Sequence, residues 1–83
     1  MSNDELTAYF HALEQALTVV MLKTSSGTFR KASAAEFMYM GKNQDCLAFK
    51  HSGSRNYIYL HHTGDLYVPQ SDEPFHRGFF DLY

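Results

Sequence analysis

The sequence predicts an α+β domain in which an N-terminal amphipathic helix packs on a curled antiparallel sheet of about five strands. Apolar residues recur with a helical period over the first 17 residues, and they alternate with a period of two in three segments between residues 45 and 69. Short polar or glycine-containing segments join these stretches, which is typical of a meander and could allow closure towards a small barrel. A chain of 83 residues is expected to form a single domain over 1–83.

The first expected element is a helix that begins at Ser2. Ser2 and Glu5 form a capping-box pattern, which satisfies backbone donors at a helix start. The apolar stripe of this helix consists of Leu6, Phe10, Leu13 and Leu17. The composition becomes β-branched at Thr18, so we expect the helix to end there, although Val20 would continue the stripe if the helix ran to Leu22.

Residues 18–31 are interpreted as strand, turn and strand, because a β-branched run is followed by Ser-Ser-Gly and a second extended run. Ser33 and Glu36 then form a second capping-box pattern, and Gly41 is a natural helix stop. These signals favour a helical turn or short helix over 33–41. A strand is the alternative, because residues 37–40 would also fit a sheet.

The next two strands have a register that the apolar pattern determines, since a slip of one residue would exchange the two faces of the sheet. We expect His51 to pair with Asn56 across the loop at 52–55. The core face then carries Leu47, Phe49, Ile58 and Leu60. The outer face carries Cys46, Ala48, Lys50, Tyr57, Tyr59 and His61.

The second turn is predicted to be a three-residue loop at 62–64, in which Gly64 supplies the left-handed conformation. This loop keeps Tyr67 on the outer face and places Asp65 opposite His61. A two-residue loop would turn Tyr67 inwards, and it remains an alternative because loop length is weakly determined by sequence.

The aromatic content exceeds what one small core usually accommodates, with six tyrosines and seven phenylalanines. The C-terminal tail at 75–83 is apolar, and we expect its Phe79 and Phe80 to dock on the core, on a second subunit or on a target. The net charge of −2 gives no strong footprint for duplex DNA or an acidic membrane. A single cysteine, no signal peptide and no long apolar run predict a soluble cytoplasmic protein.

Five side chains are candidate metal ligands, namely Cys46, His51, His61, His62 and His76. We expect them not to converge, because strand alternation would turn His61 and His62 to opposite faces and His51 to the core face. No paired ligand spacing is present either. The sequence therefore predicts no metal and no cofactor.

A histidine opposite an aspartate suggests a catalytic pair, with Ser54 or Cys46 as a nearby nucleophile. Cross-strand His61 and Asp65 also pair for ordinary structural reasons, and a hairpin surface offers neither a water-excluding pocket nor oxyanion donors. We therefore expect a protein that is not an enzyme.

The order of a helix followed by five strands faintly resembles that of Sm-like proteins, and residues 59–62 with 67–69 are similar to the last two strands of that family. The basic residue that the family has before its histidine is absent here. The stretch between Phe29 and Phe49 is also longer than in the family. The sequence is therefore assigned to no family.

The expected function is an interaction module that binds a protein partner, or a second copy of itself, through an aromatic sheet face and the C-terminal tail. The alternative is binding of single-stranded RNA or DNA on the same face, by base stacking on tyrosines. A further possibility is that the helix or the tail covers the tyrosines. The expected binding residues are Lys50, Arg55, Tyr57, Tyr59, His61, Tyr67, Phe79 and Phe80.

Overall fold

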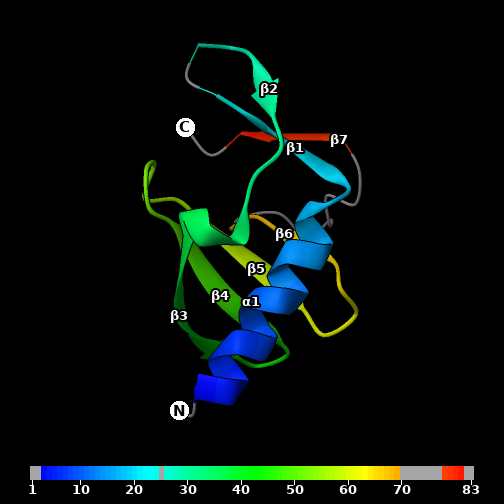
Figure 1. The fold of residues 1–83 in the computed structure, drawn as a ribbon, viewed down its shortest axis with the longest axis vertical. Coiled ribbons are helices and arrows are strands. Elements are labelled where there is room, and N and C mark those ends of the chain that lie inside the picture. Colours follow the sequence, from blue (N-terminus) through cyan, green and yellow to red (C-terminus); the bar gives the residue numbers. More distant parts are fainter. Residues whose placement is uncertain (1–2, 25, 70–77, 82–83) are drawn as a thin grey trace.

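A long helix lies across one face of a four-stranded sheet, and a smaller sheet adjoins them (Figure 1). This arrangement comes from a computed structural model that describes residues 3–24, 26–69 and 78–81, the last of these for their backbone only. The elements are α1 (Asn3–Leu17), β1 (Val20–Lys23), β2 (Phe29–Arg30), the 3₁₀ helix η1 (Ala34–Glu36), β3 (Phe37–Asn43), β4 (Cys46–His51), β5 (Tyr57–His61), β6 (Leu66–Tyr67) and β7 (Gly78–Asp81). The α+β class predicted from the sequence is confirmed.

Helix α1 ends at Leu17, so the alternative of a helix that runs to Leu22 is wrong. The backbone N–H of Thr18 donates to the carbonyl oxygen of Gln15 at 3.2 Å, and the Thr18 hydroxyl donates to the same oxygen at 2.7 Å. These two bonds close the last turn before the β-branched residues begin β1. The expected capping residue, Ser2, lies outside the described residues.

The four-stranded sheet has the order β3-β4-β5-β6, and the predicted register of β4 with β5 is confirmed. The N–H of His51 donates to the carbonyl of Asn56 at 2.8 Å, as the pairing across the first loop requires. At the second turn the N–H of Gly64 donates to the carbonyl of His61 at 2.9 Å, and Gly64 has a φ of +93°. The three-residue loop is therefore correct, and Tyr67 pairs with Tyr59 on the outer face.

The predicted helix over 33–41 is only partly correct. The capping box of Ser33 and Glu36 is present, but it begins a 3₁₀ helix of only three residues. Strand β3 begins directly after it, at Phe37. Pairing with β4 satisfies backbone N–H and C=O groups of this segment, whereas a short isolated helix is only marginally stable in water. Gly41 is not a helix stop: it has a φ of +124° and sits where the β3–β4 register shifts at a bulge.

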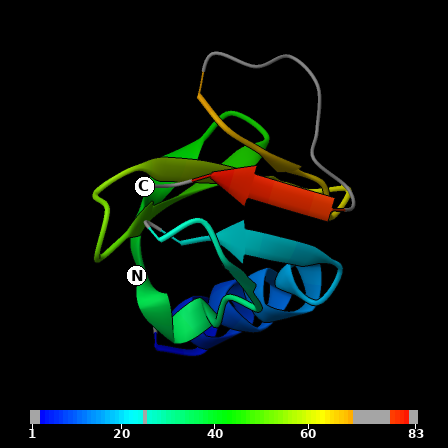
Figure 2. The same ribbon diagram turned by 90° about the horizontal axis from the view of Figure 1, so that it is seen from above.

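The second sheet has the order β2-β1-β7. The predicted antiparallel pairing of the two strands around residues 25–27 is confirmed by the β1–β2 register. Strand β7 pairs with β1 in parallel, from Val20 with Gly78 to Lys23 with Asp81, and both strands run in the same direction in Figure 2. The strands therefore form two sheets instead of one meander, and these sheets do not close into a barrel.

The core lies between α1 and the inner face of the four-stranded sheet, and it continues into β1. Its largest fully buried side chains are Phe49, Leu13, Leu17, Leu22, Ile58, Leu66, His51 and Val20. The four residues predicted for the core face of β4 and β5 all belong to this core or pack against it. Within the described residues, no helix has the length and apolarity needed to cross a bilayer.

Candidate functional site

The outer face of the four-stranded sheet carries three tyrosines, which we call the tyrosine face: Tyr57, Tyr59 and Tyr67. Tyr59 pairs with Tyr67 across β5 and β6, and the rings of Tyr57 and Tyr59 have their centroids 6.5 Å apart. All three side chains are half-buried. The register predicted from the sequence thus gives the expected aromatic surface.

Basic side chains border the tyrosine face, as expected. Lys50 pairs with Tyr57, and its Nζ lies 5.8 Å from the centroid of the Tyr57 ring, within the range of a cation–π contact. The ring of His61 lies edge-on to Tyr67, with centroids 6.2 Å apart. Arg55 is exposed in the β4–β5 loop and has a φ of +67°. The structure therefore brings the five sheet residues together and places Arg55 at the loop that adjoins them.

Phe79 and Phe80 lie in a different part of the fold. Both belong to β7, where their backbones pair with Met21 and Leu22 of β1 in the three-stranded sheet. The strand pairing shows that this end of the tail docks within the chain. Among the three docking partners left open by the sequence, the backbone at 78–81 pairs with a strand of its own chain.

An ionic cluster at the far end of β4 explains the buried His51. Both terminal nitrogens of the Arg30 guanidinium donate to the carboxylate of Glu36, one of them at 2.7 Å. The Nε2 atom of His51 lies 3.1 Å from a Glu36 oxygen, and the N–H of Ser54 donates to His51 Nδ1 at 3.1 Å. Because Nδ1 accepts a hydrogen bond, the ring proton is on Nε2 and donates to Glu36.

The electrostatics of this cluster favour an ionised carboxylate. The hydrogen bond from Arg30 is the largest influence, and together with bonds from the Ser33 N–H and from His51 it outweighs partial burial and lowers the pKa of Glu36 to about 2. The cluster joins β2 and η1, which are near neighbours in sequence, to β4. We interpret the cluster as a structural interaction that holds these elements together. Both ring nitrogens of His51 are engaged in it, so His51 is not a candidate metal ligand.

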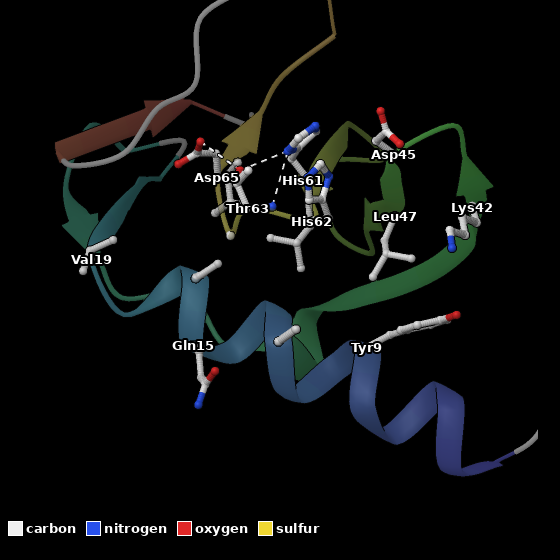
Figure 3. Close-up of a pocket in the computed structure, with 15 residues that line it drawn as sticks. Tyr9, Gln15, Val19, Lys42, Asp45, Leu47, His61, His62, Thr63 and Asp65 are labelled. Carbon is white, nitrogen blue, oxygen red and sulfur yellow. Dashed lines mark hydrogen bonds between the residues drawn. The ribbon is translucent and has the colours of Figure 1, made fainter.

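A groove of about 720 Å³ opens between α1 and the turns at one end of the four-stranded sheet (Figure 3). Apolar side chains of the helix and sheet line it, namely Ala12, Ala16, Leu47, Leu60 and Leu66. Its polar lining residues include Lys42, Asp45, His61, His62, Thr63 and Asp65. An apolar interior with a few convergent polar groups is typical of a binding site.

Two histidines and an aspartate converge at this groove. The rings of His61 and His62 have their centroids 4.1 Å apart, and one potential ligand atom from each of His61, His62 and Asp45 lies within 4.8 Å of the other two. The expectation that the two histidines diverge is wrong. His62 is the first residue of the loop, where the alternation of the strand no longer applies.

Among the described residues, the other candidate ligands do not join this group. Cys46 pairs with His61 across the sheet but is absent from the cluster, and His76 lies outside the described residues. Asp45 was not singled out in the sequence. The predicted register contained the signal, because a ladder that pairs Cys46 with His61 also places Asp45 beside His62.

The side chains of His61 and Asp65, the suggested catalytic pair, are connected through the hydroxyl of Thr63. His61 Nδ1 lies 3.0 Å from the hydroxyl of Thr63, and that hydroxyl donates to Asp65 Oδ2 at 3.0 Å. Asp65 thus reaches His61 through Thr63. Ser54 belongs to the loop at the opposite end of β5, so the sheet separates this nucleophile from the histidine.

Comparison with protein-family models, with curated proteins and with solved structures finds no match for this chain. The tyrosine face and the groove are therefore the features from which a function can be inferred.

Proposed function

We propose that the protein is a small non-enzymatic interaction module that binds a protein partner through the tyrosine face. The observation that carries the proposal is the pairing of Tyr59 with Tyr67 beside Tyr57, with all three side chains half-buried on one sheet face. Tyrosine is enriched at interfaces because it offers a large, rigid and half-polar contact at low entropic cost.

The surface beside the tyrosines favours a protein partner with an apolar centre. Met38 pairs with Lys50, so it lies on the outer face of β3, and it is 40% exposed. Met40, on the same edge strand, is 46% exposed. Exposed methionines adapt to irregular partner surfaces. Lys50 and Arg55 would meet acidic groups at the edge of such an interface.

The first test is whether the chain binds itself, because a second copy is the partner that any preparation contains. Sedimentation equilibrium over a wide concentration range measures this directly. We expect the double variant Tyr59→Ser/Tyr67→Ser to weaken self-association, while Phe29→Ser, which alters an exposed aromatic on β2, leaves it unchanged. Amide NMR spectra of both variants must retain the native dispersion.

If the chain is monomeric, the partner is another protein. A candidate recovered with the wild-type chain is purified and titrated against the isotope-labelled protein. The proposal expects amide shifts on β5 and β6 and loss of binding in the double tyrosine variant. A strict monomer whose partners bind the double variant as well as they bind the wild type contradicts the proposal.

A second candidate function is the binding of single-stranded nucleic acid on the same face. The contact of Lys50 with the Tyr57 ring favours it, because a cation beside a stacking platform can meet a phosphate while the ring stacks on a base. Titration with a mixed single-stranded RNA pool at low salt distinguishes the two functions. Nucleic-acid affinity should fall steeply with added salt, whereas an aromatic protein interface should be much less sensitive.

A further inference from the structure

We propose that Asp45, His61 and His62 bind a transition-metal dication of the Zn²⁺ class at the groove. Two imidazole nitrogens and a carboxylate oxygen form a donor set that suits zinc, while hard cations such as Mg²⁺ prefer oxygen ligands. The inference does not depend on the proposed function: Asp45 and His62 lie in turns outside the tyrosine face, and His61, which borders that face, can bind a metal whether or not the tyrosines bind a partner.

The spacing of the three ligand atoms lies near that of a metal site. Metal–ligand distances close to 2 Å in a tetrahedral site place two ligand atoms roughly 3.3 Å apart. The ligand atoms of this cluster lie within 4.8 Å of one another. Asp45 and His62 are exposed, so rotation of their side chains can close the remaining gap without movement of the sheet.

The backbone already holds the three residues together. The N–H of His62 donates to the carbonyl oxygen of Asp45 at 3.2 Å, which joins the β3–β4 turn to the β5–β6 loop. One residue further into the sheet, Cys46 pairs with His61. The ligands therefore come from adjacent positions of one hydrogen-bonded ladder, and only side-chain freedom is lost when a metal binds.

The hydrogen bonds around His61 can stabilise the tautomer that binds a metal through Nε2. With a metal on Nε2, Nδ1 carries the proton and can donate to the Thr63 hydroxyl at 3.0 Å, and this hydroxyl donates to Asp65. Carboxylate-linked acceptors of this kind orient metal-binding histidines. The N–H of Thr63 also approaches Nδ1 at 3.3 Å and favours the opposite tautomer in the free protein, so metal binding would select between the two.

The groove gives the metal an open position. Three protein ligands leave one site of a four-coordinate ion for water or for a donor atom of a bound molecule. The three ligands line the same groove as Leu47, Leu60 and Leu66 (Figure 3). A molecule with an apolar body and a carboxylate or imidazole donor would fill the groove while completing the coordination of the metal.

The test uses the untagged full chain, treated with a chelator and then titrated with ZnCl₂ by calorimetry at about pH 7.5, where histidine ligands bind in the neutral form. We expect one Zn²⁺ per chain. His62→Ala and Asp45→Asn should each weaken binding by more than about 100-fold, since loss of an orienting group alone costs roughly 10–100-fold. Thr63→Val should weaken it by about 10-fold.

His11→Ala is the matched control, because His11 is an exposed histidine on α1 that is not part of the cluster. This variant should bind Zn²⁺ like the wild type. Equal affinity in the wild type, His62→Ala and Asp45→Asn would overturn the proposal, as would the absence of measurable binding by the wild type.

A second measurement locates the metal without any substitution. Paramagnetic Co²⁺, which also accepts imidazole ligands, should broaden the amide signals of Asp45, His61 and His62 before all others. Broadening centred on another part of the chain would assign the metal elsewhere and contradict the site.

Discussion

The Nε2 atom of His51 lies 3.1 Å from the Oε1 atom of Glu36, and this contact joins the core to the surface of the domain. His51 is 2% exposed, while Glu36 extends outwards to the partly exposed Arg30. Removal of Glu36 would take a hydrogen-bond partner from the buried His51 ring, whereas removal of His51 would leave Glu36 with its bonds from Arg30 and Ser33. Two predictions concern this pair.

Glu36→Gln should destabilise the domain at neutral pH and remove part of its acid sensitivity. The folded-state pKa of Glu36 is lowered from its ordinary value of 4.5 to about 2, so its contribution is present above pH 4.5 and is lost as the pH falls towards 2. We expect a loss on the order of 1–3 kcal/mol at pH 7.

Denaturant unfolding of the wild type and of Glu36→Gln at pH values between about 2 and 7 measures this effect. The two free energies of unfolding should converge as the pH falls. Glu14 is an unsuitable control, because its carboxylate accepts from the N–H of Ala34. Asp4→Asn changes an acid in the first turn of α1 and serves instead. A constant difference between wild type and Glu36→Gln at all pH values would contradict the assignment.

His51→Ala should cost about 2–4 kcal/mol, because it leaves a cavity and removes one partner of Glu36 and the ring nitrogen that accepts from the Ser54 N–H. His11→Ala, at an exposed helix position, should change the free energy of unfolding by less than about 0.5 kcal/mol. Thermal melts of the two variants check the difference. Similar melting temperatures would show that the buried cluster adds little stability.

Much of the four-stranded sheet follows from sequence because two independent signals agree there. Apolar alternation sets the faces of β4 and β5, and the left-handed preference of Gly64 sets the length of the second loop. The 33–41 segment lacks such agreement. Its capping box is real but serves only one 3₁₀ turn, and the rest is a strand because it pairs with β4 across the turn at residues 44–45, a pairing that the local pattern does not show.

The parallel pairing of β7 with β1 could not be predicted for a similar reason. Periodicity identifies a strand but does not show which sheet edge it joins, and about 55 residues separate these two strands. The candidate sites divide in the same way. The tyrosine face follows from the alternation in β5 and β6 and the loop between them, whereas the cluster of Asp45 and His62 requires two turns to be considered together.

The two phenylalanines of contrasting burial provide a third prediction. Phe49 is 0% exposed and its ring contacts Phe10 and Tyr39, whereas Phe29 is 44% exposed. Phe49→Ala should cost about 3–5 kcal/mol, because the cavity lies between the helix and the sheet. Phe29→Ala should cost less than about 1 kcal/mol. Urea unfolding measures both values, and equal losses would contradict the location of the core.

The last prediction concerns the loop that places His61 opposite Asp65. Gly64 has a φ of +93°, and a Cβ added there would meet no atom within 4 Å. Gly64→Ala should therefore cost about 1 kcal/mol through backbone strain alone, without a steric clash. Gly53 lies in the other hairpin loop but has no positive φ, so Gly53→Ala should be neutral or slightly stabilising.

Denaturant midpoints of these two glycine variants give the comparison. Gly64→Asn should recover part of the loss, because asparagine tolerates the left-handed conformation better than alanine does. If Gly64→Ala were as stable as the wild type, the three-residue loop would not need a left-handed residue.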